Sequence, residues 1–289
     1  MNKVGIYFAF WEPEWKADYV KYVRKVKRLG FDVLEVAAGG IAEMTSAERE
    51  RLTRTAEDEG ITLSYCIGLP PQYDIASENS SVRRAGIDYV KNLLLAIREM
   101  KGQTLGGIIY ACWPGGRYDL EEKKKMRARS LVSLKEILPL CEDCEIDYCL
   151  EVVNRFEQCI LNTAQEGVAF VEETGSPRAK LLLDSFHMNI EEDDISSAIR
   201  SSASCLGHFH IGENNRRLPG QGKTDWQSIF STLKDIDYRG KIVMEPFIRP
   251  GGQVGEDIKI FRDLSCGADE AKMDALAEQS CRFVKSNLK

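Results

Sequence analysis

Short runs of apolar, β-branched and aromatic residues recur along the chain, and each is followed by a longer amphipathic segment. The short runs predict strands at Val4–Phe10, Val33–Ala38, Thr62–Gly68, Gly107–Cys112, Asp147–Val153, Lys180–Asp184, Gly207–Gly212 and Lys241–Phe247. The longer segments predict helices at Trp15–Leu29, Ser46–Glu59, Ser81–Met100, Leu120–Cys141, Thr163–Glu173, Ile195–Ser202, Asp225–Ile236 and Asp269–Leu288. Gly30 and Gly60 directly follow two of these helices, as expected of residues that end a helix.

The strict order of strand and then helix predicts an α/β fold with a parallel sheet and right-handed crossovers. Eight such units favour closure into a (β/α)8 TIM barrel, for which about 250 residues is typical, and the chain has 289. An open, doubly wound sheet is the alternative, but no Gly-x-Gly-x-x-Gly follows the first strand. Because no linker or break in composition interrupts the pattern, we expect one domain over residues 1–289.

The composition limits the classes of binding partner and the cellular compartment expected for the protein. The formal net charge of −6 disfavours a nucleic-acid partner, which usually meets a basic surface. No stretch approaches the ~20 apolar residues of a membrane span, and Glu12 and Glu14 end the apolar run Val4–Trp11, unlike in a signal peptide. Nine cysteines without a framework spacing suggest free thiols in a reducing cytoplasm. We therefore expect a cytoplasmic protein without nucleic-acid or membrane partners.

Polar residues stand at the carboxyl ends of the last four predicted strands, where a barrel carries its catalytic groups. These residues are Glu151, Asp184, His210 and Glu245. Side chains alternate in a strand, so each should lie on the same face as the residue two positions before it, and the four should converge. Any one of them could be a loop cap or an ion-pair partner, but all four on successive strand ends favour a common site.

Three carboxylates and one imidazole at bonding distance repel and lose hydration unless a cation joins them. Oxygen-rich ligation with one nitrogen suits Mn²⁺, Co²⁺ or Mg²⁺ better than a structural thiolate zinc site. We therefore expect one divalent metal ion, with Mn²⁺ favoured, and no organic cofactor.

Several longer strings resemble the D-tagatose 3-epimerase and D-allulose (D-psicose) 3-epimerase family, and the resemblance runs nearly end to end. They include the opening Gly5-Ile6-Tyr7 with Trp11 and Trp15, the run from Glu151 to Glu157, the run from Leu183 to Glu192, the run from Gly207 to Glu213, and the run from Val243 to Phe247. The resemblance implies a metal-dependent ketose 3-epimerase on a TIM barrel, acting as a homodimer or homotetramer.

The resemblance also implies roles for individual residues. Glu151, Asp184, His210 and Glu245 match the metal ligands, and Glu151 and Glu245 match the two acid–base residues. Positions that hold the O1 to O3 end of the sugar are matched by Glu157, His187 and Arg216. Positions that line the rest of the sugar are matched by Tyr7, Trp15, Cys66, Trp113 and Phe247.

The hypothesis for the reaction is proton transfer at C3 of a free ketohexose or ketopentose through a cis-enediolate, between two glutamates on opposite faces. The candidate pairs are D-tagatose and D-sorbose, and D-fructose and D-allulose. An aldose–ketose isomerase or a sugar dehydratase on the same kind of barrel is the alternative, and a non-catalytic sugar-binding protein is a more remote one.

Overall fold

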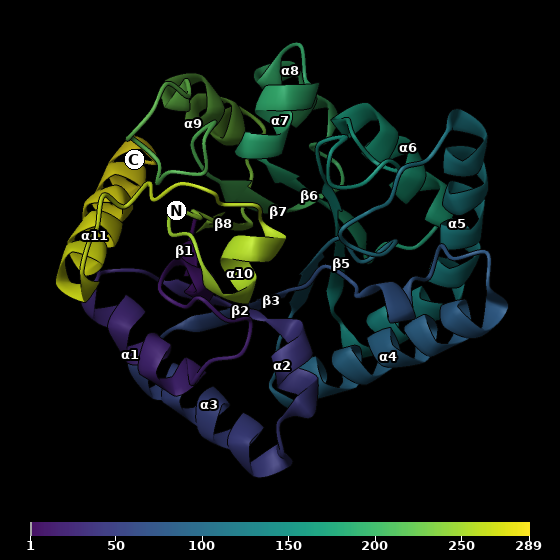
Figure 1. Ribbon diagram of the computed structural model, residues 1–289, viewed down its shortest axis with the longest axis horizontal. Coiled ribbons are helices and arrows are strands. Elements are labelled where there is room, and N and C mark those ends of the chain that lie inside the picture. Colours follow the sequence, from purple (N-terminus) through teal and green to yellow (C-terminus); the bar gives the residue numbers. More distant parts are fainter. Residues whose placement is uncertain (1) are drawn as a thin grey trace. The chain divides into compact units, whose positions relative to one another are not determined.

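The computed structural model describes residues 2–289 and contains eight parallel strands in one closed sheet (Figure 1). The strands follow one another around the sheet in sequence order, which confirms the predicted TIM barrel. They are β1 (Val4–Tyr7), β2 (Val33–Ala37), β3 (Thr62–Cys66), β4 (Thr104–Gly107), β5 (Asp147–Val152), β6 (Ala179–Asp184), β7 (Leu206–Ile211) and β8 (Lys241–Met244).

Helices follow the strands, and several begin at a side chain that caps the first turn. Thr45 and Glu48, for example, form a reciprocal capping box at the start of α3, which satisfies backbone N–H groups that have no partner inside the helix. The α-helices are α1 (Tyr19–Arg28), α2 (Ala38–Glu43), α3 (Ser46–Glu59), α4 (Ser80–Glu99), α5 (Leu120–Cys144), α6 (Ala164–Thr174), α7 (Ser185–Glu191), α8 (Ile195–Ser201), α9 (Trp226–Asp235), α10 (Gly252–Asp257) and α11 (Glu270–Asn287), and the 3-10 turns are η1 (Phe8–Phe10) and η2 (Pro71–Tyr73). Within residues 2–289, no helix is both long and apolar enough to cross a membrane.

Contacts divide the chain into two compact units, the first of which holds the residues up to Ser64 and those from Phe209 onward. In this unit β1 pairs with both β2 and β8, and Gly5 lies opposite Val33 and Val243. A Cβ atom on Gly5 would lie 2.6 Å from the Cβ of Val33, so glycine permits this close pairing. Helices α1 and α3 lie against each other, and α11 contacts β1 (Figure 1).

The second unit spans Tyr65–His208. Its central strands are β4, β5 and β6, in which Gly106 pairs with Cys149 and Glu151 pairs with Leu182. Helices α4, α5 and α6 lie side by side along these strands (Figure 1). The pairing of β5 with β6 places the ends of two strands that carry candidate residues next to each other.

The prediction for the fourth strand is wrong in its position. Strand β4 is Thr104–Gly107, whereas the apolar run that predicted Gly107–Cys112 lies after it. Gly107 has a φ of +112°, and a Cβ there would lie 2.2 Å from the carbonyl oxygen of Ile67. The chain therefore leaves the strand at Gly107, in a conformation that only glycine adopts readily.

Smaller differences concern element ends. The first strand stops at Tyr7 and continues as η1, and the third and eighth strands end at Cys66 and Met244 rather than at Gly68 and Phe247. Helix α1 begins at Tyr19 instead of Trp15. The short helices α2, α7 and α10 were not predicted. Helices α2 and α10 each contain two glycines, which favour a helix poorly, and α7 begins directly at the end of β6.

Candidate functional site

In the second unit, Glu151 and Asp184 stand on the adjacent strands β5 and β6. Glu151 pairs with Leu182, two residues before Asp184, so the two carboxylates lie on the same face. Both are buried, and Oδ1 of Asp184 accepts a hydrogen bond of 2.8 Å from the backbone N–H of Phe186 in the first turn of α7. Asp184 is thus both the end of a strand and the cap of the helix that follows.

Helix α7 brings His187 to these carboxylates. The Nε2 atom of His187 lies 3.7 Å from Oε1 of Glu151 and 3.8 Å from Oδ2 of Asp184. The Nδ1 atom of the same ring lies 3.2 Å from the backbone nitrogen of Asn154, which donates to it. A backbone N–H can only donate, so Nδ1 is the acceptor and the ring proton is on Nε2. His187 therefore presents an N–H toward the carboxylates.

Glu157 connects His187, through Asn154, to the indole of Trp113. Its Oε1 accepts from Nδ2 of Asn154 at 3.2 Å, and its Oε2 accepts from Nε1 of Trp113 at 3.0 Å. The Nδ2 atom of Asn154 also lies 2.8 Å from Nδ1 of His187. Trp113, Glu157, Asn154 and His187 thus form one connected chain of polar contacts.

In the first unit, His210 lies in β7 and Glu245 directly follows β8. The backbone N–H of Glu245 donates to the carbonyl of Ile211 at 3.1 Å, so the chain continues beside β7 after the named strand ends. Nδ1 of His210 lies 3.8 Å from Oε2 of Glu245. Both side chains are buried.

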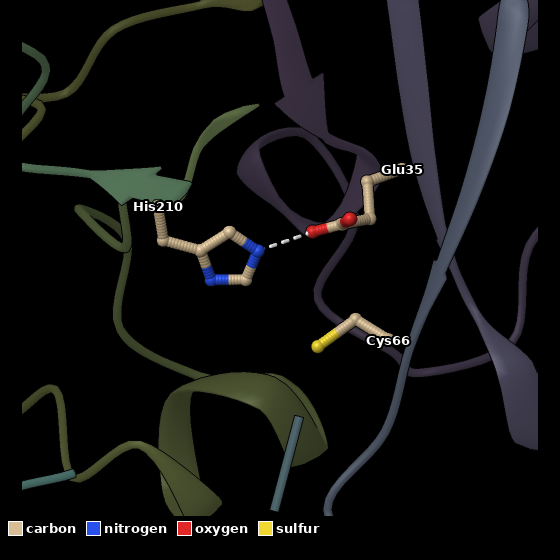
Figure 2. A group of neighbouring side chains, drawn as sticks. All are labelled: Glu35, Cys66 and His210. Carbon is tan, nitrogen blue, oxygen red and sulfur yellow. Dashed lines mark hydrogen bonds and ion pairs between the residues drawn. The ribbon is translucent and has the colours of Figure 1, made fainter. Parts of the chain in front are cut away.

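The other nitrogen of His210 faces a residue on β2. Nε2 of His210 lies 2.6 Å from Oε1 of Glu35, and both side chains are fully buried. Figure 2 shows the imidazole facing this carboxylate. The hydroxyl of Ser64 donates to Oε2 of Glu35 at 2.8 Å. Both carboxylate oxygens of Glu35 therefore have a hydrogen-bond partner.

Arg216 meets Glu245 from the loop after β7. Its Nη1 donates to Oε2 of Glu245 at 3.1 Å, and its guanidinium lies 5.4 Å from the ring centre of Phe247. Arg216 has a φ of +64°. Its backbone is bonded on both sides, because its N–H donates to Glu213 and its carbonyl accepts from Phe247. The strained conformation is thus held by contacts that also aim the guanidinium.

Four ligand groups come together. One ligand atom from each of Glu151, Asp184, His210 and Glu245 lies within 4.8 Å of the others, and all four residues are buried. Three buried carboxylates this close need a compensating positive charge. The donor set fits a hard divalent cation, because it offers mainly carboxylate oxygen with one imidazole nitrogen.

Comparison with known proteins agrees with this geometry. Residues 23–264 match the xylose isomerase-like TIM barrel family. The chain is 44% identical over 283 residues to the D-psicose 3-epimerase of Agrobacterium fabrum, with 98% of each chain covered. It is 43% identical to the D-psicose 3-epimerase of Ruminiclostridium cellulolyticum, covering 98% of this chain and 97% of that one. A crystal structure of D-psicose 3-epimerase with D-tagatose from Clostridium cellulolyticum H10 superposes with a TM-score of 0.97 at 42% identity, covering 99% of both chains.

The chain belongs to the ketose 3-epimerase family.

In this ketose 3-epimerase, three of the four aromatic residues predicted to line the sugar lie near one another. Ring centres are 6.2 Å apart for Tyr7 and Phe247, 6.3 Å for Tyr7 and Trp15, and 6.4 Å for Trp15 and Phe247. Nε1 of Trp15 donates to Asp257 at 2.7 Å, which fixes the indole on α10. Cys66 ends β3 and is buried.

Two residues of the epimerase that contact this site were not predicted to have a role. Asn154 carries no signal of its own in the sequence beyond its place directly after the fifth predicted strand. Glu35 carried a usable signal, because it is an acidic residue inside the apolar run Val33–Ala37, and a Glu is rarely buried without a partner. The identity of that partner, 175 positions away, was not available from local sequence.

Proposed function

We propose that this chain epimerises free ketohexoses at C3 and interconverts D-fructose with D-allulose and D-tagatose with D-sorbose. The observation that carries the proposal is the group of Glu151, Asp184, His210 and Glu245, whose ligand atoms lie within 4.8 Å of one another. Names of related structures support the substrate class, since one D-psicose 3-epimerase is described with D-tagatose and another in the presence of D-fructose. Ketopentoses are a second substrate class, because an L-ribulose 3-epimerase structure is 30% identical with a TM-score of 0.89.

These four side chains would hold one divalent cation, with Mn²⁺ favoured and Co²⁺ or Mg²⁺ as alternatives. When bound, such a cation supplies Lewis-acid stabilisation of negative charge on the sugar oxygens. The set has one nitrogen and no thiolate, which matches the preference of these ions for oxygen ligands.

Glu151 and Glu245 would exchange the C3 proton. One carboxylate removes the proton to give a cis-enediolate, and the other delivers a proton to the opposite face of C3, which inverts that centre. Arg216, 3.1 Å from Glu245, places a fixed positive charge beside one of the two bases and can stabilise a developing oxyanion.

His187 would donate its Nε2–H to a sugar oxygen at the O1 to O3 end. Its proton position follows from the N–H of Asn154, which occupies Nδ1. Glu157 would bind the same end of the sugar while it anchors Trp113 and Asn154. Tyr7, Trp15, Cys66, Trp113 and Phe247 would line the remainder, where aromatic faces pack against sugar C–H groups.

The test is a panel of free ketoses incubated with purified protein and Mn²⁺ in heavy water. We expect C3 epimers that carry deuterium at C3, and little product from the Glu151→Gln or Glu245→Gln variants. Glu166→Gln is the matched control, because Glu166 is not among the four ligand residues and its side chain pairs with Lys123. An aldose product would indicate an isomerase, loss of water a dehydratase, and binding without turnover a sugar-binding protein.

We further propose a cytoplasmic homodimer or homotetramer in which the chain unfolds as one domain. The nine cysteines are free thiols, which suits a reducing compartment. The family resemblance supports an oligomer, and light scattering measures its size. Coincident unfolding of probes placed in residues 2–64 and in 65–208 would support a single domain, and two separate transitions would contradict it.

A further inference from the structure

We propose that Glu35 is a positioning residue that holds His210 in the tautomer protonated on Nε2, so that Nδ1 is the atom offered to the cation. The inference rests on the proposed metal site and adds a residue to it. Glu35 is not among the four ligand residues, although with Cys66 and His210 it forms a second group of potential ligand atoms. Its Oε1 faces Nε2 of His210 and its Oε2 accepts from Ser64. Its effect on the cation would therefore be exerted through the imidazole.

The two ring nitrogens of His210 face different groups. Nε2 is 2.6 Å from Oε1 of Glu35, whereas Nδ1 is 3.8 Å from Oε2 of Glu245 (Figure 2 shows the first contact). An imidazole nitrogen is more basic than a carboxylate, so the shared proton belongs to Nε2 and the carboxylate accepts. Nδ1 then keeps its lone pair on the side of Glu245.

The burial of Glu35 and its second hydrogen bond support a role in holding the imidazole of His210. Glu35 lies in β2, is fully buried, and would be costly there without partners. Ser64 occupies Oε2, which leaves Oε1 directed at the imidazole. A carboxylate that accepts from a metal-binding histidine fixes the ring and makes it a better ligand, and loss of such a partner typically weakens metal affinity 10- to 100-fold.

A purely structural role for the contact predicts something different. If Glu35 served only to fill the core, its replacement would change stability but leave the affinity for the cation and the tautomer of His210 unchanged. The affinity for the cation and the position of the imidazole proton therefore distinguish a positioning role from a purely structural one. Neither measurement requires turnover.

The experiment measures Mn²⁺ binding to chelator-treated protein, by electron paramagnetic resonance, for the wild type, Glu35→Leu, Glu35→Gln and Ser64→Ala. Glu35→Leu should weaken Mn²⁺ binding about 10- to 100-fold. Glu35→Gln keeps an oxygen acceptor but not the charge, so its affinity for Mn²⁺ should lie between those of the wild type and Glu35→Leu. Ser64→Ala is the matched control, because it removes the other partner of Glu35 and leaves the imidazole contact intact; its affinity should stay near that of the wild type.

Nitrogen-15 spectra of histidine-labelled, metal-free protein give the second readout, and the chain has only three histidines. His210 should carry its proton on Nε2 in the wild type and in Glu35→Gln. Equal Mn²⁺ affinity in the wild type and in a folded Glu35→Leu variant, or a proton on Nδ1 in the wild type, would overturn the role of Glu35 alone. Failure of the wild type to bind Mn²⁺ would overturn the metal site and this inference together. If Glu35→Leu does not fold, the wild-type spectrum and Glu35→Gln still decide.

Discussion

The backbone N–H of Asn154 donates to Nδ1 of His187 across 3.2 Å, so a main-chain group determines which nitrogen of that histidine carries the proton. Because the donor is a main-chain group, replacing the side chain of Asn154 by another such as alanine leaves it in place. The arrangement separates two functions of Asn154, because its backbone sets the tautomer while its Nδ2 atom connects His187 to Glu157.

The Asn154→Ala variant tests that separation. We expect the proton of His187 to stay on Nε2, because the backbone donor remains. Loss of the side-chain contacts should lower kcat/KM about tenfold, which is the effect of roughly 1.4 kcal/mol. Nitrogen-15 spectra and steady-state kinetics with D-fructose measure the two effects. A changed tautomer in the variant would show that the side chain, not the backbone, sets the proton position.

Single substitutions of the two glutamates should separate exchange from epimerisation. If Glu151 and Glu245 act on opposite faces of C3, each single Gln variant keeps one base, and that base can still exchange the C3 hydrogen of one epimer with solvent. Epimerisation should fall about 10²- to 10⁴-fold in both variants, while deuterium exchange persists for different epimers in the two. Bound Mn²⁺ is quantified in parallel, so that loss of the ion is not mistaken for loss of a base. Exchange of the same epimer in both variants would contradict the two-face scheme.

Removal of the cation should lower both activity and thermal stability. A ligand that binds only the folded state stabilises it by about 2.7 kcal/mol at a free concentration 100 times its Kd. Chelation should therefore abolish epimerisation and lower Tm by several degrees, and added Mn²⁺ should restore both. The measurement is differential scanning calorimetry with and without chelator. An unchanged Tm together with full activity after complete chelation would rule out the metal site.

An ion pair beside the site should make stability depend on acid pH. Glu191 accepts from the backbone N–H and the guanidinium of Arg155, and this hydrogen bonding to Arg155 lowers the pKa of Glu191. A lowered pKa in the folded state means that the contribution is present above the unfolded pKa and is lost as pH falls through the folded pKa. Glu191→Gln should therefore lower Tm at neutral pH, and the difference from wild type should shrink as the pH is reduced below about 4. A difference in Tm that stays constant with pH would contradict this origin.

Gly107 should be intolerant of substitution. Its φ is +112°, and an added Cβ would lie 2.2 Å from the carbonyl oxygen of Ile67. Gly107→Ala should reduce the free energy of unfolding by more than about 2 kcal/mol, because it combines strain with a backbone clash. Gly175→Ala is the control, since Gly175 has a φ of +71° but no atom within 4 Å of the added Cβ, and it should cost only about 1 kcal/mol. Urea denaturation compares the two variants, and equal losses would refute the importance of the clash.

The sequence alone determined the order of the elements and the places of the candidate ligands. The periods of two residues in strands and 3.6 residues in helices are local consequences of backbone geometry. They are therefore recognisable in the sequence without knowledge of any tertiary contact. They placed Glu151 in β5, Asp184 at the end of β6 and His210 in β7, as the structure has them. They placed Glu245 inside the eighth strand, whereas β8 ends one residue before it. The fourth strand was misplaced because its own residues, Thr104–Gly107, include two glycines, while a stronger apolar run follows them.

Only the tertiary structure decided which groups touch and which atoms carry protons. Glu35 and His210 are 175 positions apart, and Asn154 and His187 are 33 apart. No local period encodes such a pairing, because a hydrogen bond depends on differences of a few tenths of an ångström that packing sets. The residue types of the ligand group were therefore predictable from the chain, whereas the groups that face the ring nitrogens of His187 and His210 are brought there only by folding.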